Sequence, residues 1–305
     1  MATPSASSST APTQPAPPAW TDPLLQSPHT VKDKARRVNE MFSAIAPSYD
    51  LNNRLHSLWM DQHWRNVAVK MAAVKDSDRI LDVACGTGDL TLKFAEVLNH
   101  RSCLKPNQVI GLDFTFEMLP IAVRKSGDHA ISKEIVRERE RSQKEEYDRM
   151  AAQGVLVSFN LDDATMRDEV PFVNGDAMAL PFPNASMDVL SIAFGIRNVS
   201  DWGAAIDEFT RVLKPGGRLI ILEFSLPTNF VLRAFYNFYF KKIMPITATL
   251  ISGDKSGAYK YLPQSVNTFI SRQAMQDRMK AAGLVDVIAR PMTFGICVCY
   301  KGVRP

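Results

Sequence analysis

Residues 80–91, ILDVACGTGDLT, constrain this 305-residue chain more than any other segment. The first four residues are predominantly apolar and predict a buried β-strand, with Asp82 as its single charge. Gly86 and Gly88 then allow a tight turn and a close approach of a ligand to the backbone, because glycine has no Cβ. A strand that runs through a glycine turn into a helix predicts an α/β domain that directs free backbone N–H groups at a ligand.

A second apolar run, residues 109–112, ends in Asp113 about 25 residues further on, which is a spacing typical of nucleoside-binding units. An acidic residue at the end of this strand is placed to accept hydrogen bonds from ribose hydroxyls. A dinucleotide would need a third glycine to seat its pyrophosphate, and Asp82 and Asp89 would repel phosphate. S-adenosylmethionine carries a ribose, a sulfonium and an ammonium but no phosphate. The turn therefore predicts an S-adenosylmethionine site, and a glycine turn without a ligand is the alternative.

Composition fits one large α/β domain with additions, or two small domains. The formal net charge is +4 and no segment is strongly basic, so nothing indicates nucleic acid binding. No apolar run approaches the roughly 18 to 20 residues that span a bilayer. The four cysteines and five histidines have neither zinc-ligand nor disulfide-framework spacing, so we expect reduced cysteines and no metal.

The amino-terminal segment is rich in Ser, Thr, Ala and Pro. We expect residues 1–28 to be a disordered tail and residues 29–305 to form the domain. The segment contains no Arg or Lys before Lys32, whereas mitochondrial import leaders are amphipathic and Arg-rich. It is therefore a poor transit peptide: the true start lies elsewhere, targeting is unconventional, or the segment is only a tail.

Apolar periodicity predicts the order of the elements. At least two helices are expected over residues 31–74, interrupted at Pro47. Later strands are expected over 171–174, 188–194, 218–224, 285–290 and 295–300, with a helix over 202–212 and a turn over 214–217. Strands that alternate with helices, followed by a terminal hairpin, predict a seven-stranded, mainly parallel sheet.

The chain from Glu117 into the 150s is predicted as helix, and residues 124–149 are dense in mixed charge. Alternating charge signs with few apolar residues are typical of a solvated helix or a flexible insertion. We therefore interpret residues 124–154 as a charged helical insertion, with partner binding as the alternative.

Four segments together are typical of one enzyme family: residues 49–64, residues 81–91, FGIRN at 194–198 and RVLKPGGRLIILEFS at 211–225. Over residues 38–302 the chain resembles the ubiquinone/menaquinone biosynthesis C-methyltransferases. This resemblance implies a class I methyltransferase with a Rossmann-like fold, N-terminal helices and a C-terminal antiparallel hairpin. The first segment departs from the family pattern, with Asn52 in place of the usual Met, His56 in place of an aliphatic residue, and Asp61 in place of His.

The resemblance also implies how S-adenosylmethionine is bound. Asp113 would hold the ribose diol, while Asp176 and the Ala177 N–H would face the adenine. A serine that contacts the cofactor in the family falls on Ala193 here. The predicted cofactor-binding residues are Asp82, Gly86, Thr87, Gly88, Asp113, Asp176 and Ala177.

The implied reaction is C-methylation of the ring of 2-methoxy-6-polyprenyl-1,4-benzoquinol in ubiquinone biosynthesis. A ring carbon is a poor nucleophile unless a neighbouring hydroxyl loses its proton, so a base or a cation is needed near the ring. Because a guanidinium keeps its proton, Arg197 is predicted to orient a water or stabilise the phenolate, with Asn198 fixing its geometry. Tyr49 and Asp50 could close over the same space. The alternatives are an ion pair for Arg197 and core packing for Tyr49.

Residues 230–246, FVLRAFYNFYFKKIMPI, form an aromatic-rich helical stretch with Lys241 and Lys242 near its end. Three interpretations are open for this stretch: a wall of a prenyl tunnel, a helix at a membrane interface, or an ordinary buried helix or dimer face.

The expected cellular location and the expected partners follow from the resemblance alone. It implies a peripheral protein on the matrix face of the mitochondrial inner membrane, a multi-subunit ubiquinone-synthesis complex, and a homodimer as a further option. Two other functions are kept: a methyltransferase of this fold that acts on another lipid or small molecule, and a cofactor-binding scaffold subunit whose catalysis is dispensable.

Overall fold

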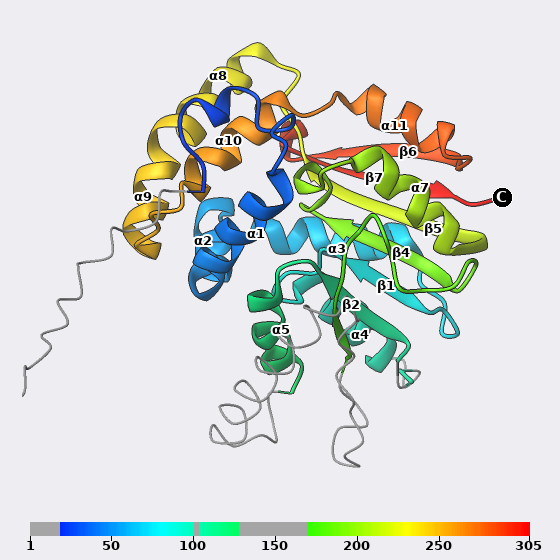
Figure 1. Ribbon diagram of the computed structural model, residues 1–305. Coiled ribbons are helices and arrows are strands. Elements are labelled where there is room, and N and C mark those ends of the chain that lie inside the picture. Colours follow the sequence, from blue (N-terminus) through cyan, green and yellow to red (C-terminus); the bar gives the residue numbers. More distant parts are fainter. Residues whose placement is uncertain (1–18, 101–103, 106, 128–169) are drawn as a thin grey trace, which may run out of the picture.

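The computed structural model describes residues 19–100, 104–105, 107–127 and 170–305 (Figure 1). Seven strands form one sheet in the order β3-β2-β1-β4-β5-β7-β6, as predicted. Because β2 and β4 lie on opposite sides of β1, the chain changes direction there, which is where ligands bind in such sheets. The strands are β1 (Ile80–Val83), β2 (Val109–Asp113), β3 (Phe172–Asn174), β4 (Met187–Ala193), β5 (Leu213–Phe224), β6 (Val285–Met292) and β7 (Cys297–Val303).

The first five strands are parallel, and β7 pairs antiparallel with both β5 and β6. Every residue of β1 and β2 is buried, as expected for parallel strands that are covered on both faces. The turn predicted at residues 214–217 lies inside β5, which is a correction. Leu213 already pairs with Met187, and the register then shifts before Arg218 pairs with Val189, so the Pro-Gly segment interrupts the strand without ending it.

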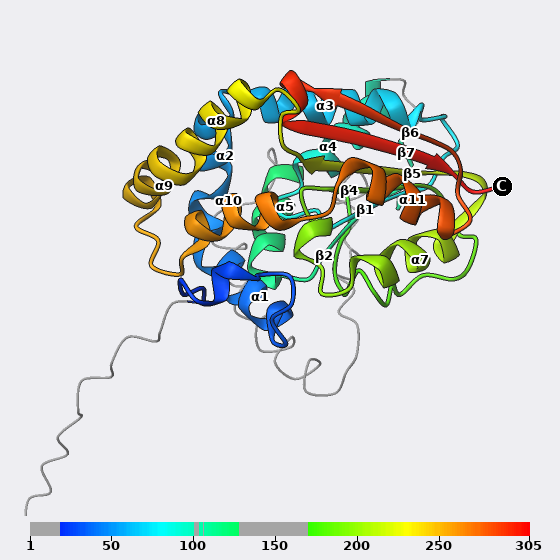
Figure 2. The same ribbon diagram turned by 90° about the horizontal axis from the view of Figure 1, so that it is seen from above.

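Helices cover both faces of the sheet (Figures 1 and 2). One face packs against α3 (Met60–Ala72), α4 (Asp89–His100) and α5 (Leu119–Ser126). The other face packs against α7 (Trp202–Val212) and α11 (Arg272–Ala281). The prediction of a helix over residues 202–212 is confirmed. Asp201 begins this helix by accepting a hydrogen bond from the Ala204 N–H, which satisfies a free backbone donor of the first turn.

Five further helices gather at one end of the sheet and form a cap (Figures 1 and 2). A π-helical turn, Tyr239–Ile243, joins α8 directly to α9, so the predicted helical stretch at residues 230–246 is helical throughout and changes its winding in the middle. The cap consists of α1 (Lys34–Ile45), α2 (Tyr49–Ser57), α8 (Phe230–Phe238), α9 (Met244–Ser252) and α10 (Ala258–Thr268).

Residues 19–28 pack into the cap. Trp20 is 2% exposed, its ring stacks on Tyr261 with centroids 4.3 Å apart, and its backbone N–H donates to the Ser256 carbonyl. The expected disordered tail is therefore wrong for residues 19–28, because Trp20 and Leu25 supply enough apolar surface to hold this Pro-rich segment. The rest of the expected tail lies outside the described residues.

The charged insertion is described only at its start. Helix α5 ends at Ser126, and the remainder of the helix expected to run into the 150s falls on residues that the structure does not describe. Within the described residues, none of the helices has the length and apolar content to cross a membrane.

We expect Trp20→Ala to lower the free energy of unfolding by about 3 kcal/mol, because it removes a fully buried aromatic side chain and leaves a cavity. Trp59→Ala is the matched control, because Trp59 is 58% exposed, and it should change the free energy by much less. Urea denaturation followed by circular dichroism measures both. Equal losses in the two variants would contradict the packing of residues 19–28.

Candidate active site

The buried side chain of Asp82 supports the glycine turn between β1 and α4. This carboxylate is buried and accepts hydrogen bonds from Thr91 Oγ1 and Ser191 Oγ, both at 2.6 Å. Burial raises the pKa of Asp82 to about 6. Asp82 lines neither of the two cavities described below. Asp82 thus ties the turn to α4 and β4 from inside the fold, and its predicted cofactor contact stays a prediction.

The two glycines of the turn have different surroundings, although both adopt a left-handed conformation, with φ of 56° at Gly86 and 82° at Gly88. A Cβ at Gly88 would lie 3.1 Å from Ala122 and Phe172, whereas a Cβ at Gly86 would meet only Tyr49, at 3.9 Å. Gly88 therefore serves close packing of the turn on α5 and β3. Gly86 borders a cavity and leaves space there for a ligand.

A smaller cavity opens over the glycine turn, at the ends of β1, β2 and β4. It brings together four of the predicted cofactor-binding residues and two predicted catalytic residues: Gly86, Asp113, Asp176, Ala177, Tyr49 and Asn198. Thr87 and Gly88 do not line it. The Thr87 hydroxyl instead donates to Asp50 Oδ1 at 2.6 Å, so Thr87 connects the turn to α2.

Asp113 is the central acceptor of the smaller cavity. Its carboxylate accepts the backbone N–H groups of Gly86 and Thr115, both at 2.7 Å, and burial raises its pKa to about 6. A carboxylate can accept further hydrogen bonds, so Asp113 can hold ribose hydroxyls while it fixes the turn. Asp176 accepts the Met178 N–H at 2.9 Å, which fixes the loop that presents Ala177. These acceptors fit a nucleoside that carries positive charge.

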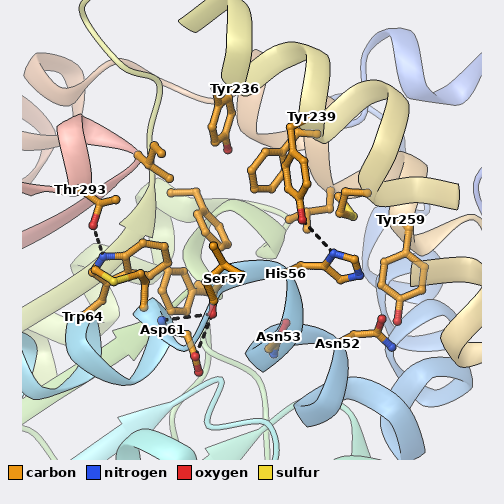
Figure 3. Close-up of a pocket in the computed structure, with 18 of the residues that line it drawn as sticks. Asn52, Asn53, His56, Ser57, Asp61, Trp64, Tyr236, Tyr239, Tyr259 and Thr293 are labelled. Atoms are coloured by element: carbon orange, nitrogen blue, oxygen red, sulfur yellow. Dashed lines mark hydrogen bonds between the residues drawn. The ribbon is translucent and has the colours of Figure 1, made fainter. Parts of the chain in front are cut away.

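A larger cavity of about 530 Å³ lies between the cap and the sheet (Figure 3). Its wall is mostly apolar and aromatic and comes from α1, α2, α3, α8, α9, α10 and the ends of β4 and β5. Three aromatic residues, Phe42, Tyr49 and Phe194, line both cavities. The two cavities therefore meet at these rings, and a flat apolar molecule in the larger one lies next to a ligand on the glycine turn.

Arg197 lines the larger cavity and is ion-paired. Its Nη1 donates to Glu223 Oε1 at 2.7 Å and to the Phe194 carbonyl at 2.6 Å, and its guanidinium lies 5.3 Å from the centre of the Phe224 ring. The ion pair with a carboxylate, which was the alternative for Arg197, is thus present in the structure. Glu223 was missed, although it is the only acidic residue in the apolar strand RLIILEF and is 2% exposed. Such a buried charge requires a partner.

The other two predicted catalytic residues have separate environments. Asn198 donates to the Phe194 carbonyl at 3.3 Å and accepts the Tyr261 hydroxyl at 3.0 Å, so it shares an acceptor with Arg197 but lies at the smaller cavity. Tyr49 stands between the cavities, and burial raises the pKa of its phenol. Tyr49 therefore remains protonated near neutral pH, and its ring borders both cavities.

A cluster of ion pairs, which sequence reasoning missed, connects the cap to the glycine turn. Asp89 accepts from Arg54 Nη2 at 2.6 Å and from Lys125 Nζ at 2.5 Å. Burial opposes its ionisation, but Arg65, Lys125 and Arg54 outweigh this and lower its pKa to about 2. Asp61, where the chain departs from the family pattern, pairs with Arg54 at 2.5 Å and Arg65 at 2.8 Å. Asp61 therefore has a structural role here.

The model of the ubiE/COQ5 methyltransferase family matches residues 30–170 and 158–304. The chain belongs to this family. It is 40% identical over 265 residues to the demethylmenaquinone methyltransferase of Thermus thermophilus, which covers 87% of this chain and 100% of the relative. It is 35% identical over 276 residues to the ubiquinone/menaquinone biosynthesis C-methyltransferase of Geobacter sulfurreducens, covering 90% and 91% of the two chains.

Among solved structures, an S-adenosylmethionine-dependent methyltransferase of Thermotoga maritima superimposes with a TM-score of 0.52 at 19% identity, covering 88% of this chain and 100% of that one. This likeness shows the class I methyltransferase fold. The family and this fold together establish that the chain is an S-adenosylmethionine-dependent C-methyltransferase of quinone biosynthesis. The expected cofactor is confirmed.

We expect the affinity for S-adenosylhomocysteine to fall as the pH decreases below about 6, because Asp113, with its pKa raised to about 6, then loses the charge that accepts hydrogen bonds. Asp113→Asn should bind more weakly at pH 7.5 and show little of this fall. Isothermal titration calorimetry between pH 5 and 8 measures both. Asp277→Asn, on the exposed side of α11, is the control. A fall of wild-type size in Asp113→Asn would assign the titration to another group.

Proposed function

We propose that the acceptor is the ring of a polyprenyl quinol. The observation that carries this proposal is the junction at Phe42, Tyr49 and Phe194, where an aromatic-lined cavity of about 530 Å³ meets the cavity of the glycine turn. A volume of this size suits a small ring with the first part of its tail. Membership of the ubiE/COQ5 methyltransferase family supports the same substrate class.

The residues of the chain have distinct tasks in this reaction. When bound, S-adenosylmethionine supplies an electrophilic methyl group on sulfur. Tyr49 and Phe194 hold the acceptor ring against the smaller cavity and exclude water, which favours an in-line approach of the ring carbon. Arg197 places a positive charge at the cavity wall, where it stabilises the negative charge that forms on the ring oxygen next to that carbon. A new carbon–carbon bond forms and the carbon–sulfur bond of the donor breaks. The ring carbon then loses its proton and the ring oxygen regains one, so that the net reaction releases a single proton to solvent.

Two acceptors fit this chemistry. The first is 2-methoxy-6-polyprenyl-1,4-benzoquinol, the substrate expected from the sequence in ubiquinone biosynthesis. The second is the bicyclic demethylmenaquinol, which is favoured by the relative that is 40% identical and bears the name demethylmenaquinone methyltransferase. Both have an unsubstituted ring carbon next to a phenolic hydroxyl.

We expect the purified protein to transfer labelled methyl groups from S-adenosylmethionine to at least one of these two quinols, offered separately with short prenyl chains under reducing conditions. Mass spectrometry of the product identifies the acceptor and the methylated carbon. Asp113→Ala should lose this activity together with cofactor binding. Cofactor binding without methylation of either quinol would favour the scaffold function or another acceptor.

Arg197 needs a paired variant in this assay, because Arg197→Leu alone would leave Glu223 as an unpaired buried charge. The double variant Arg197→Leu with Glu223→Gln removes the cation and the anion together. It should keep its affinity for S-adenosylhomocysteine and lose about 100-fold in turnover. Unchanged turnover would limit Arg197 to the ion pair.

We also propose that the outer side of α8 and α9 rests on an anionic membrane surface. One side of these helices lines the larger cavity, and the other side is exposed, which argues against an ordinary buried helix. The outer side exposes Phe230, Phe238 and Leu250, which are 81%, 60% and 79% accessible. Residues 230–252 include Arg233, Lys241 and Lys242 but no acidic residue, which is a pattern typical of interfacial helices. A lipid acceptor would thus enter the cavity beside the membrane.

We expect the protein to float with liposomes that contain anionic lipid and to remain at the bottom of the gradient with neutral ones. Phe238→Asp combined with Leu250→Asp should abolish flotation and keep turnover of a short-chain quinol in detergent, because neither side chain lines the larger cavity. A wild-type protein that does not float, together with a dimer that this double variant dissociates, would assign the surface to a second copy instead.

The mitochondrial inner-membrane location and the multi-subunit ubiquinone-synthesis complex remain predictions from the family resemblance. The two relatives described above are bacterial proteins. Both predictions depend on the benzoquinol as the acceptor, so methylation of demethylmenaquinol alone in the substrate assay would contradict both.

A further inference from the structure

The larger cavity contains buried polar atoms without a hydrogen-bond partner. Two of them belong to one side of α2: Asn52 Oδ1 and His56 Nε2. Buried polar atoms in proteins are almost always satisfied, and leaving one unpaired costs free energy. In a cavity that is otherwise mostly apolar, these two atoms mark the place where a ligand supplies hydrogen bonds.

The remaining polar atoms of both side chains are already engaged, which fixes their orientation. Asn52 Nδ2 donates to the Ser48 carbonyl at 3.1 Å, so its Oδ1 is left as an acceptor. His56 Nδ1 lies 3.1 Å from the Tyr239 hydroxyl, and Figure 3 shows the imidazole between Tyr239 and Tyr259. Residues four apart on a helix are neighbours on its surface. Asn52 and His56 therefore lie next to each other on one side of α2.

We propose that Asn52 and His56 form a subsite for one hydroxyl of the quinol ring, a proposal that rests on the proposed function. One hydroxyl satisfies both atoms. Tyr239 donates its proton to His56 Nδ1, His56 Nε2–H donates to the ring oxygen, and the ring O–H donates to Asn52 Oδ1. No other arrangement of these groups lets a single hydroxyl pair with both, since it has only one proton to give.

The protonation states of the two neighbours agree with this chain of donors. Burial lowers the pKa of His56, so the imidazole is neutral near pH 7 and has one N–H. Burial raises the pKa of Tyr239, so its hydroxyl keeps the proton that it donates.

The subsite distinguishes the reduced from the oxidised acceptor. A quinone carbonyl can accept from His56 Nε2–H but has no proton for Asn52 Oδ1, which would stay buried and unpaired. Only the quinol is nucleophilic enough at carbon to be methylated. The subsite therefore selects the oxidation state that can react.

The position of the subsite assigns it to the ring oxygen remote from the methyl donor. Tyr49, Asn52 and His56 share one side of α2, and His56 lies seven residues after Tyr49. Tyr49 borders both cavities, whereas Asn52 and His56 line the larger cavity and not the smaller one. A ring whose reacting carbon meets the boundary of the two cavities directs its far oxygen toward His56. Asn52 and His56 are thus positioning residues that set the register of the ring.

The test is anaerobic equilibrium dialysis of a short-chain quinol and its quinone against the protein saturated with S-adenosylhomocysteine. Wild type should prefer the quinol by about tenfold. Asn52→Met should remove this preference by weakening quinol binding alone. His56→Leu should weaken quinol and quinone alike by about tenfold, because both accept from Nε2–H, and His56→Gln should restore most of the loss. The affinity for S-adenosylhomocysteine should remain constant in all three variants.

His63→Leu, at an exposed position of α3, is the matched control and should bind like wild type. The inference is overturned if Asn52→Met keeps the preference for the quinol, or if His56→Leu and His56→Gln behave identically. Because binding is measured without turnover, a protein that discriminates through Asn52 but methylates neither quinol would refute the proposed reaction and support the subsite.

Discussion

The Asp89 carboxylate is the contact on which the arrangement of the active site depends. It stands at the start of α4 and binds Arg54 from α2 and Lys125 from α5, so three elements that are distant in sequence meet at the glycine turn. Lys125 also reaches Asp50 at 2.8 Å, next to the ring of Tyr49. The Asp89 carboxylate is largely buried, so separating it from these cations would leave an uncompensated charge. This cluster helps to hold α2 over the glycine turn, together with Lys34 of α1, which donates to the Arg197 and Val199 carbonyls.

The sheet could be predicted from the sequence because its signals are local. Apolar runs bounded by turns gave the seven strands in order, and the glycine turn with Asp113 located the smaller cavity. Asp82 shows the limit of such reasoning. A charge at the end of a strand was interpreted as a ligand contact, and its hydrogen bonds to Thr91 and Ser191 were not foreseen. Those partners come from α4 and β4, and no local pattern reveals which hydroxyl groups converge on a carboxylate.

The cap and the larger cavity could not be predicted, because they depend on tertiary contacts. Nothing around Trp20 indicates that its ring stacks on Tyr261, 241 residues away. Arg197 was identified from its motif, whereas its partner Glu223 required the register of β5 beside β4. The departure at Asp61 is intelligible only with Arg54 and Arg65 around it. In each case a local sequence pattern pointed to one residue of an interacting pair, and only the tertiary structure identified its partner.

The active site is divided between two parts of the chain, and this affects how the acceptor specificity of such an enzyme can change. The smaller cavity is built largely from strand ends and the loops that follow them, while much of the larger cavity wall comes from α2 and the cap helices. Among the residues that the structure describes, only the aromatic boundary at Phe42, Tyr49 and Phe194 belongs to both. Helix α8 lines the larger cavity and not the smaller one, so substitutions on its inner side can alter the preferred acceptor without changing a residue of the cofactor cavity. The architecture thus places acceptor contacts on a helix that is separate from the cofactor cavity, which makes α8 the natural target for changing specificity.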